Sequence, residues 1–388
     1  MLVKSPMLFT PLPLRGRTLR NRLVISPMCM HEARDGFARD WHLVHYGKFI
    51  MGGAALVFTE STAVSEDSRV GVADLGIWSD DHIPGLKRLA DFAHENGALM
   101  GVQIAHSGRK AFSEPLWAGG RVLKPEALDA TGVKWCRVGP SAIAAGESWS
   151  VPEALDTTQI AEIRAQHVAA ARRANEADMD ALELHFGHGY LVASFLSPIS
   201  NMRSDDYGGP IENRMRLAIE ITREVRQAWP QDKPLFVRLS CVDGAEGGWS
   251  MDDTVVLAAH LKAQGADVID CSSGGLSGLM NRSATPRGFG FQVPFAARVR
   301  NEADIATQAV GIIVDPDQAE AILREGQADL VAIGRAALED PYWPAKAWKA
   351  LAGEVGFAPW PLQHRDWLDK REPVLKRLRE TAPSTSRS

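Results

Sequence analysis

Three side chains capable of acid–base chemistry stand close together in "LHFGHGYL", which covers residues 184–191. His185 and His188 are three residues apart, and Tyr190 follows two residues later. The cluster comes directly after "DMDALEL", a run typical of a buried strand. Two imidazoles and a phenol at the end of a strand can bind a metal, donate hydrogen bonds to a substrate oxygen, or hydrogen-bond only within the core.

The sequence around the two histidines lacks the additional ligands that a metal-binding histidine pair usually has. Zinc-binding pairs have further ligands and a nearby carboxylate, as in HExxH. No Glu lies between His185 and His188, and no HxH motif follows the first strand-like run. We therefore expect no metal and disfavour a metal-dependent barrel hydrolase. A purely structural histidine pair stays open beside a pair of N–H donors with Tyr190 as a nearby acid.

Strand-like apolar runs alternate with helix signals along the chain. Near-continuous apolar character is typical of strands that are covered on both sides. We expect strands at residues 22–28, 54–60, 99–105, 180–185, 234–240, 267–273, 309–314 and 329–334. Helix starts are indicated by Asp156 or Thr157, by the capping box "SMDD" at 250–253, and by Pro316 after Asp315. The alternation predicts an α/β fold, a (β/α)8 TIM barrel, with a doubly wound sheet as the alternative.

Two segments depart from this repeat. Residues 107–152 form a long stretch rich in Gly, Pro and Trp after the third strand, and loops of this length are usually functional. We expect a single barrel domain at residues 1–350 with a lid-like insertion at 107–152. Residues 351–388 form a C-terminal extension, and its final "APSTSRS" is expected to be disordered.

Composition and charge are those of an ordinary globular protein. The chain has 388 residues, 45% hydrophobic and 23% charged, and its net charge of −5 gives no general attraction to nucleic acid or to an anionic membrane. Four scattered cysteines without CxxC spacing argue against a zinc site and a disulfide framework. No apolar run reaches the length of a membrane span, and prolines interrupt the N-terminal residues. We expect a cytoplasmic protein with no nucleic-acid and no membrane partner.

The ends of the last two predicted strands suit a phosphate. Barrels often bind phosphate between these loops through backbone N–H groups, and Gly311, Gly334 and Arg335 stand there. The alternative is that the glycines relieve tight turns and Arg335 forms a surface ion pair. The strand ends contain no carboxylate pair of the glycosidase kind. No strand-associated GxGxxG predicts a Rossmann dinucleotide site.

Together these residues resemble the old yellow enzyme family, FMN-dependent ene-reductases on a (β/α)8 barrel. The resemblance covers roughly residues 6–350. Its most specific part is the N-x-R-x-D-x-Y-G-G-x-x-x-N-R core at 201–214, supported by "LRNRLVISPMCM", "IAHSGRKA", "VRLS", "AVGIIVD" and "ADLVAIGRAALEDPYWP". "PMCM" and the HxxH pair are similar to the thermophilic-like subgroup, which includes the xenobiotic reductases.

The resemblance implies an FMN-dependent NAD(P)H oxidoreductase that reduces activated C=C bonds in enones, maleimides and nitro-compounds by ping-pong hydride transfer. NADPH or NADH would reduce the flavin, and an electrophilic alkene would reoxidise it. His185 and His188 would bind the substrate's carbonyl oxygen, and Tyr190 would protonate Cα. The expected FMN contacts are Pro27, Met28, Cys29, Ser61, Gln103, Arg238, Gly311, Gly334 and Arg335. A barrel that binds flavin or ligand without turnover is the alternative.

Three positions qualify the resemblance. His31 stands where the subgroup usually has a substrate-clamping tyrosine, and Ser61 stands where alanine or glycine is usual. "PLQHRDW" resembles the segment from which an arginine reaches a neighbouring subunit's site, which would make Arg365 a substrate contact. A homo-oligomer, dimer or tetramer, is therefore expected.

Overall fold

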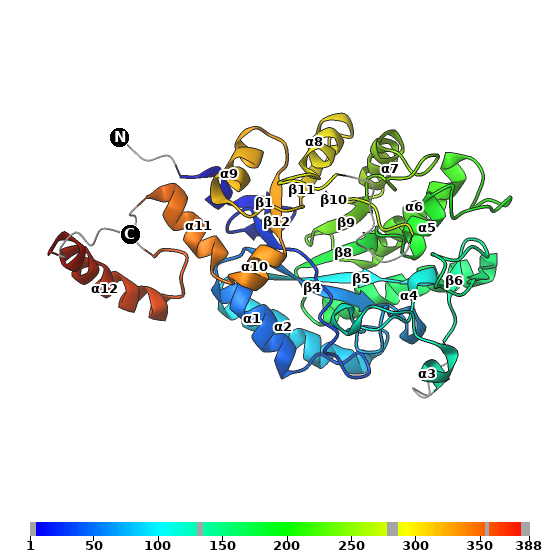
Figure 1. Cartoon of the computed structure of the whole chain (residues 1–388), viewed down its shortest axis with the longest axis horizontal. Coiled ribbons are helices and arrows are strands. Elements are labelled where there is room, and N and C mark those ends of the chain that lie inside the picture. Colours follow the sequence, from blue (N-terminus) through cyan, green and yellow to red (C-terminus); the bar gives the residue numbers. More distant parts are fainter. Residues whose placement is uncertain (1–4, 130–134, 278–285, 354–356, 382–388) are drawn as a thin grey trace, which may run out of the picture.

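The computed structural model of the chain describes residues 5–129, 135–277, 286–353 and 357–381. Parallel strands close into a barrel in the order β10–β11–β12–β3–β4–β5–β8–β9. These strands are β3 (Leu23–Ile25), β4 (Leu56–Ala63), β5 (Leu99–Ala105), β8 (Ala181–Phe186), β9 (Leu235–Ser240), β10 (Val268–Ser272), β11 (Ala306–Ala309) and β12 (Leu330–Ile333). Helices surround the barrel (Figure 1). The predicted (β/α)8 TIM barrel is confirmed, and the doubly wound alternative is wrong.

The helices begin where the capping signals indicated. Asp156 accepts a hydrogen bond from the backbone N–H of Gln159 at the start of α4, and Ser250 caps α7 in the same way. The helices are α1 (Asp40–Met51), α2 (Ile83–Glu95), α3 (Pro125–Asp129), α4 (Thr157–Glu176), α5 (Leu191–Leu196), α6 (Ile211–Ala228), α7 (Met251–Ala263), α8 (Val293–Glu302), α9 (Pro316–Arg324), α10 (Arg335–Glu339), α11 (Trp343–Ala352) and α12 (Leu362–Thr381). Within the described ranges, no helix has both the length and the apolar character needed to cross a bilayer.

The seventh barrel strand lies earlier than predicted. The sequence placed it at 309–314, whereas β11 covers Ala306–Ala309. Gly311 has φ +123° and Ile312 has φ +52°, so the backbone turns immediately after the strand. Ile313 is nevertheless buried, which explains why the apolar run extends beyond the strand. Gly311 therefore lies in the loop after β11.

The barrel interior has an apolar floor and a polar upper layer. The hairpin of β1 (Leu12–Leu14) and β2 (Arg17–Leu19) contributes to the floor, which contains Leu14, Leu19, Val24, Leu56, Phe58, Ala181, Phe236, Val268 and Leu330. Side chains two residues further along a strand lie on the same face. The strands therefore point a second, polar set inward above the floor, made of Gln103, Glu183, Arg238, Asp270 and Gln308, all buried. This polar layer faces the carboxyl ends of the strands.

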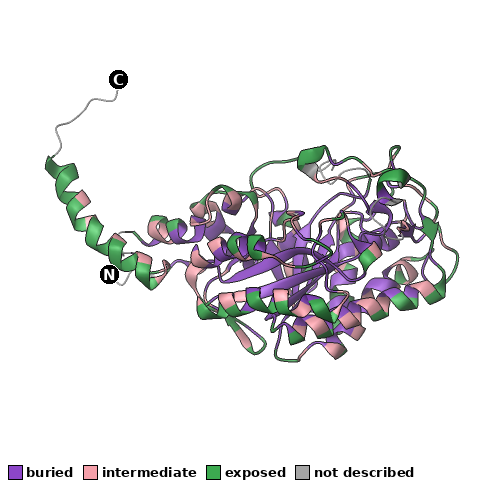
Figure 2. Cartoon of the chain, turned by 90° about the horizontal axis from the view of Figure 1, so that it is seen from below, coloured by how far each residue is buried: buried purple, intermediate pink, exposed green. Residues whose placement is uncertain are grey.

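The two segments outside the repeat contain helices and strands of their own. The insertion at 107–152 includes α3 and β6 (Val138–Gly139), and β6 pairs with β7 (Glu153–Ala154) just beyond the predicted end. Its role as a lid stays a prediction. The C-terminal extension contains the unpredicted helix α12, which projects from the barrel with no buried residue (Figure 2). The predicted disordered end, at 382–388, lies outside the described residues.

Candidate active site

Most of the expected site residues meet at the carboxyl end of the barrel. His185 on β8 is in register with Arg238 on β9, and Ser61 on β4 is in register with Gln103 on β5. The remaining residues follow neighbouring strands: Pro27, Met28, Cys29 and His31 after β3, Gly311 after β11, and Gly334 and Arg335 after β12. The exception is Arg365, which lies on α12 with an exposed side chain 3.3 Å from Asp369.

The histidine pair is linked by a hydrogen bond. The Gly187 N–H donates to Nδ1 of His185 (3.4 Å), so His185 carries its proton on Nε2. This Nε2 lies 3.2 Å from Nδ1 of His188, which acts as the acceptor. The proton of His188 is therefore on its own Nε2, 2.7 Å from Oγ of Ser272. Each ring presents an Nε2–H donor, one toward the other histidine and one toward Ser272.

Burial keeps both imidazoles neutral. It is the main reason why the pKa values of His185 and His188 are held well below their usual range. The nearby positive charges of Arg238 and Lys110 lower both pKa values further. Neutral rings at this position can donate N–H groups to an oxygen that gains negative charge, and they do not act as cationic acids.

Tyr190 adds a protonated phenol to the pair. Its ring is 5.1 Å from that of His185 in an edge-on arrangement, and it occupies the position just before α5. Burial is the main reason why the pKa of Tyr190 is raised well above its usual value, and the negative charge of Asp74 raises it further. The hydroxyl therefore keeps its proton at neutral pH and can transfer it.

Lys110 was missed by the sequence reasoning. Its Nζ donates to the backbone carbonyls of His188 (3.0 Å) and Gly275 (2.7 Å) and lies 5.6 Å from the ring centre of Tyr190. Burial lowers the pKa of Lys110 to about 7. The ammonium thus holds the loop after β8 against the loop after β10. The available signal was a basic residue shortly after the end of a barrel strand.

The floor of the site is the polar layer. Gln103 Nε2 donates to Oε2 of Glu183 (2.6 Å), while Arg238 Nη1 donates to Oγ of Ser26 (2.9 Å) and lies 3.0 Å from Oδ2 of Asp270. Gln103 and Arg238 were expected here, but Glu183 and Asp270 were not. The arrangement places a buried guanidinium and an amide below the histidine pair, where they suit a group that becomes more negative.

A buried carboxylate anchors the loop after β3. Oε2 of Glu60 accepts hydrogen bonds from the backbone N–H groups of Met30 (2.8 Å) and His31 (3.2 Å). Burial, and then the negative charges of Asp74 and Glu60, raise the pKa of Cys29 well above its usual value. Cys29 therefore remains a thiol, which suits an apolar contact with a ring system better than nucleophilic attack.

The imidazole of His31 contacts the carboxylate of Asp74. Its Nδ1 lies 2.6 Å from Oδ1 of Asp74, and both side chains are buried. Burial alone would lower the pKa of His31, but the hydrogen bond and charge of Asp74 offset this and raise it. Asp74 is in turn fixed by the N–H groups of Val70 and Gly71. The residue that replaces the usual tyrosine is therefore held in a defined ion pair.

The two glycines near the predicted phosphate site leave little room for a side chain, and Gly311 leaves the least. A Cβ on Gly311 would approach Oε1 of Gln292 to 2.7 Å, in a backbone conformation that other residues rarely adopt. A Cβ on Gly334 would lie 3.2 Å from Sδ of Met28. Since β11 and β12 are neighbours, the glycines flank one cradle, with the exposed Arg335 at its edge. These features fit a phosphate.

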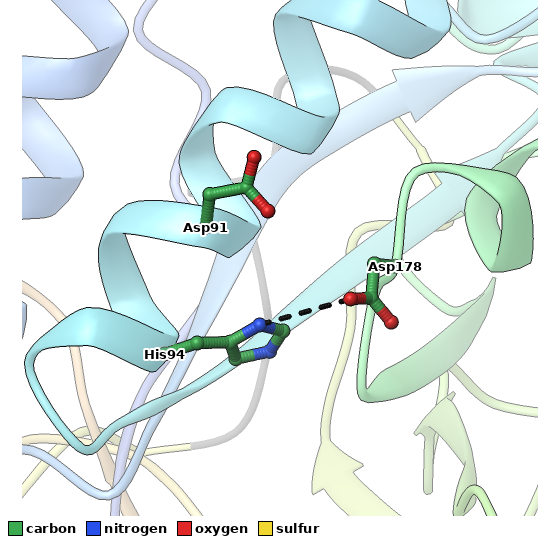
Figure 3. A group of neighbouring side chains, drawn as sticks. All are labelled: Asp91, His94 and Asp178. Atoms are coloured by element: carbon green, nitrogen blue, oxygen red, sulfur yellow. Dashed lines mark ion pairs between the residues drawn. The ribbon is translucent and has the colours of Figure 1, made fainter.

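A second polar cluster lies at the opposite, N-terminal end of the barrel (Figure 3). Among the described residues, Asp91, His94 and Asp178 are the one group of such side chains close enough to hold a metal ion. Asp91 is already paired with Lys87 (2.7 Å), and Nε2 of His94 lies 2.7 Å from Asp180. Ion pairing accounts for this surface cluster. The pair His185 and His188 is not part of any such group in the described ranges.

Comparison with known proteins gives a family match over most of the chain. The model of the NADH:flavin oxidoreductase / NADH oxidase family matches residues 7–354. An NADPH dehydrogenase of Geobacillus sp. (strain WCH70) is 44% identical over 351 residues, which are 90% of this chain and 96% of that protein. An NADPH dehydrogenase of Bacillus subtilis (strain 168) is 42% identical over 363 residues, 93% of this chain and 99% of that protein.

Solved structures share the barrel. Morphinone reductase superposes with a TM-score of 0.72 at 26% identity, covering 89% of this chain and 90% of that one. A 2-naphthoyl-CoA reductase superposes with a TM-score of 0.78 at 25% identity over 89% of this chain. The chain spans only about half, 52%, of the length of that second enzyme.

Proposed function

The chain belongs to the NADH:flavin oxidoreductase / NADH oxidase family, also called the old yellow enzyme family, and is an FMN-dependent NAD(P)H oxidoreductase; on this premise we propose that it reduces activated C=C bonds. The substrates are enones, maleimides and nitro-compounds. The observation that carries the proposal is the group formed by the buried His185 and Tyr190 and the half-buried His188, with two neutral imidazoles and a protonated phenol above a guanidinium.

Residues of the described site can hold FMN. Gly311, Gly334 and Arg335 suit its phosphate, Gln103 and Arg238 its pyrimidine edge, and the loop after β3 its ring face. The further ring contacts are Pro27, Met28, Cys29 and Ser61. A bound flavin would supply hydride transfer between a nicotinamide, NADPH or NADH, and the alkene. We expect ping-pong kinetics, in which the nicotinamide leaves before the alkene binds.

The histidines bind the substrate's activating oxygen. The oxygen of a carbonyl or nitro group becomes more negative as hydride reaches Cβ, and an N–H donor stabilises that charge. His185 can offer its Nε2–H once a ligand oxygen replaces His188 as acceptor. His188 can join it only if its ring turns away from Ser272. Because the imidazole is neutral, its rotation away from Ser272 would leave no unpaired charge in the site.

Tyr190 supplies the proton that completes the reaction. Hydride addition at Cβ leaves electron density on Cα and on the activating oxygen, and Cα must gain a proton. The phenol of Tyr190 is protonated and stands beside His185. Lys110, through its hydrogen bond to the His188 carbonyl, keeps the loop between the histidine and the tyrosine in place.

We also propose that the protein is a homo-oligomer, because Arg365 is placed to act outside its own barrel. Arg365 is exposed at the start of α12, on a helix that projects from its own barrel (Figure 2). In a homo-oligomer it would contact the substrate in a neighbouring subunit. The reacting ligands are small molecules in either case.

Absorbance under anaerobic conditions tests the proposal. Purified protein should show flavin bands that bleach with NADPH and return with cyclohexenone, and mass spectrometry of the released cofactor should give FMN. Chromatography should find cyclohexanone in the amount of NADPH consumed. A flavin that bleaches but is never reoxidised by any enone, maleimide or nitroalkene would leave the proposal without support and favour a barrel that binds flavin without this turnover.

A further inference from the structure

Two buried carboxyl groups lie in the polar layer around Arg238, and the proposed chemistry uses neither. Glu183 on β8 and Asp270 on β10 are both 0% exposed. They flank β9, the strand that carries Arg238, and they point inward like Ala181 and Val268 of the floor. Asp270 contacts the guanidinium at 3.0 Å, and Glu183 accepts a hydrogen bond from Gln103 at 2.6 Å.

The charges in this layer balance only if one carboxyl group is protonated. Arg238 carries one positive charge, so two carboxylates would leave a net negative charge above an apolar floor. Oε1 of Glu183 and Oδ1 of Asp270 are buried, and no N–H or O–H donor within the described part of the chain reaches them. An ionised oxygen without a donor is costly to bury. A proton held between two carboxyl groups satisfies both oxygens at once.

We infer that Glu183 and Asp270 share one proton beside Arg238 at neutral pH, and that Glu183, which has lost this proton at alkaline pH, takes it up again from solvent when the flavin is reduced. Burial raises the pKa of Asp270 as well, but the contact with Arg238 at 3.0 Å opposes this rise, so Asp270 is the ionised partner. Burial, and then the charge of Asp270, raise the pKa of Glu183 to about 8. His185, two residues further along β8, is neutral. Arg238 is thus the cation that both carboxyl groups face.

The coupling to the flavin rests on the proposed function, in which Arg238 contacts the flavin's pyrimidine edge. Hydride transfer adds two electrons and one proton to the ring, which therefore gains one negative charge. That charge competes with the Glu183 carboxylate for Arg238, so Glu183 binds its proton more tightly in the reduced protein. Above about pH 8, where Glu183 is ionised before reduction, two protons accompany two electrons. Glu183 and Asp270 are positioning residues because they act through Arg238.

The midpoint potential of the holoenzyme, measured by spectroelectrochemistry between about pH 7 and 10, tests the inference. In the wild-type protein the potential should fall with pH along one line and then twice as steeply above about pH 8. Glu183→Gln keeps the amide contact to Gln103 and removes the titrating group, so its line should have one slope. Asp270→Asn removes the competing carboxylate, so the pKa of Glu183 falls and the break should move to lower pH.

Infrared spectroscopy of the oxidised holoenzyme gives a second readout. The carbonyl band of a protonated carboxylic acid should be present at neutral pH, disappear as the pH rises through about 8, and be absent in Glu183→Gln. A single slope in the wild-type protein, or a break that persists in Glu183→Gln, would overturn the inference. Neither measurement contains an alkene, so failure of alkene reduction would count against the proposed function alone. If Glu183→Gln does not fold, the wild-type slopes and Asp270→Asn still decide.

Discussion

Individual protonation states in this site follow from burial. His185 and His188 are kept neutral, Tyr190 keeps its proton, and Cys29 remains a thiol, because each charged form would lose its hydration. A proton donor and two N–H donors can therefore lie together with little net charge. Such a site stabilises negative charge that develops on a bound oxygen without binding anions strongly before the reaction.

Replacing His185 tests its role as an oxygen-binding donor. His185→Ala should lower the rate of flavin reoxidation by cyclohexenone about 10²- to 10³-fold, the usual effect of losing one such donor. Flavin content should be unchanged, because the residue is not among the proposed FMN contacts. Stopped-flow absorbance gives the rate, and the ratio of flavin to protein absorbance gives the content. Loss of flavin with normal turnover per remaining flavin would instead indicate a purely structural histidine pair.

The His31 and Asp74 pair should give the folding stability a defined pH dependence. Because the folded pKa of His31 is raised, the pair stabilises the protein fully below about pH 6.5 and loses this contribution as pH rises through the folded pKa. Asp74→Asn should remove about 1 to 3 kcal/mol at pH 6 and much less at pH 9. Denaturant unfolding at both pH values measures the difference. An equal loss at both would mean that Asp74 acts only through Val70 and Gly71.

The sequence located the polar residues at strand ends but not those inside the strands. His185, Gln103 and Arg238 were expected because barrel sites lie at the carboxyl ends. Glu183 and Asp270 sit within runs that look buried, and nothing in their spacing shows that they point toward Arg238. Only the barrel register places them on one face. Their partnership depends on closure of the sheet, which a linear pattern does not contain.

At the scale of elements, residues of the N-x-R-x-D-x-Y-G-G-x-x-x-N-R core at 201–214 stabilise the backbone between two helices. Asn201 donates to the carbonyls of Phe195 and Tyr207, and Arg214 donates to the carbonyl of Leu196. These bonds fix the connection from α5 to α6 behind the histidine cluster. The seventh strand was misplaced for a local reason: the buried Ile313 continues the apolar run past Gly311, where the backbone has already turned.

The loop after β11 can be tested with a matched pair of glycine variants. Gly311→Ala and Gly326→Ala both force alanine into a positive φ, at a cost of about 1 to 3 kcal/mol. Only Gly311 also meets Gln292 at 2.7 Å beside the proposed phosphate cradle. Gly311→Ala should therefore weaken FMN binding in fluorescence titrations, while Gly326→Ala should bind FMN normally. Equal FMN affinity in both variants would indicate that the FMN phosphate does not bind at this loop.

The whole molecule combines a predictable barrel with an unpredicted appendage. Alternating apolar runs and helix caps were enough to predict the barrel, because each unit packs by the same local rules. Helix α12 was not predicted, since it has no buried residue and its pattern is interrupted by Pro373. Its contacts with the rest of the chain include those of His364 with Tyr342 and of Glu372 with Lys349, and a 20-residue helix with no buried residue gains little stability from tertiary packing.

Arg365 provides the test at this scale. If it reaches the site of a neighbouring subunit, Arg365→Ala should raise the KM for cyclohexenone about tenfold, as expected for the loss of a charged hydrogen bond. Flavin content should not change. Arg371→Ala, on the same exposed helix, is the matched control and should leave KM unchanged. Sedimentation should give a mass of at least two chains. A monomer with normal KM in both variants would contradict the assignment.

The most direct test of the central claim is stopped-flow kinetics of Tyr190→Phe, which keeps the ring and removes only the hydroxyl. Flavin reduction by NADPH needs no proton at carbon and should keep its wild-type rate. Reoxidation by cyclohexenone should slow by about 10² to 10⁴-fold, the usual contribution of a general acid. A nitroalkene, whose nitronate product can leave unprotonated, should be affected much less. If both half-reactions slow equally, Tyr190 positions ligands and does not donate the proton, and the account of this site is wrong.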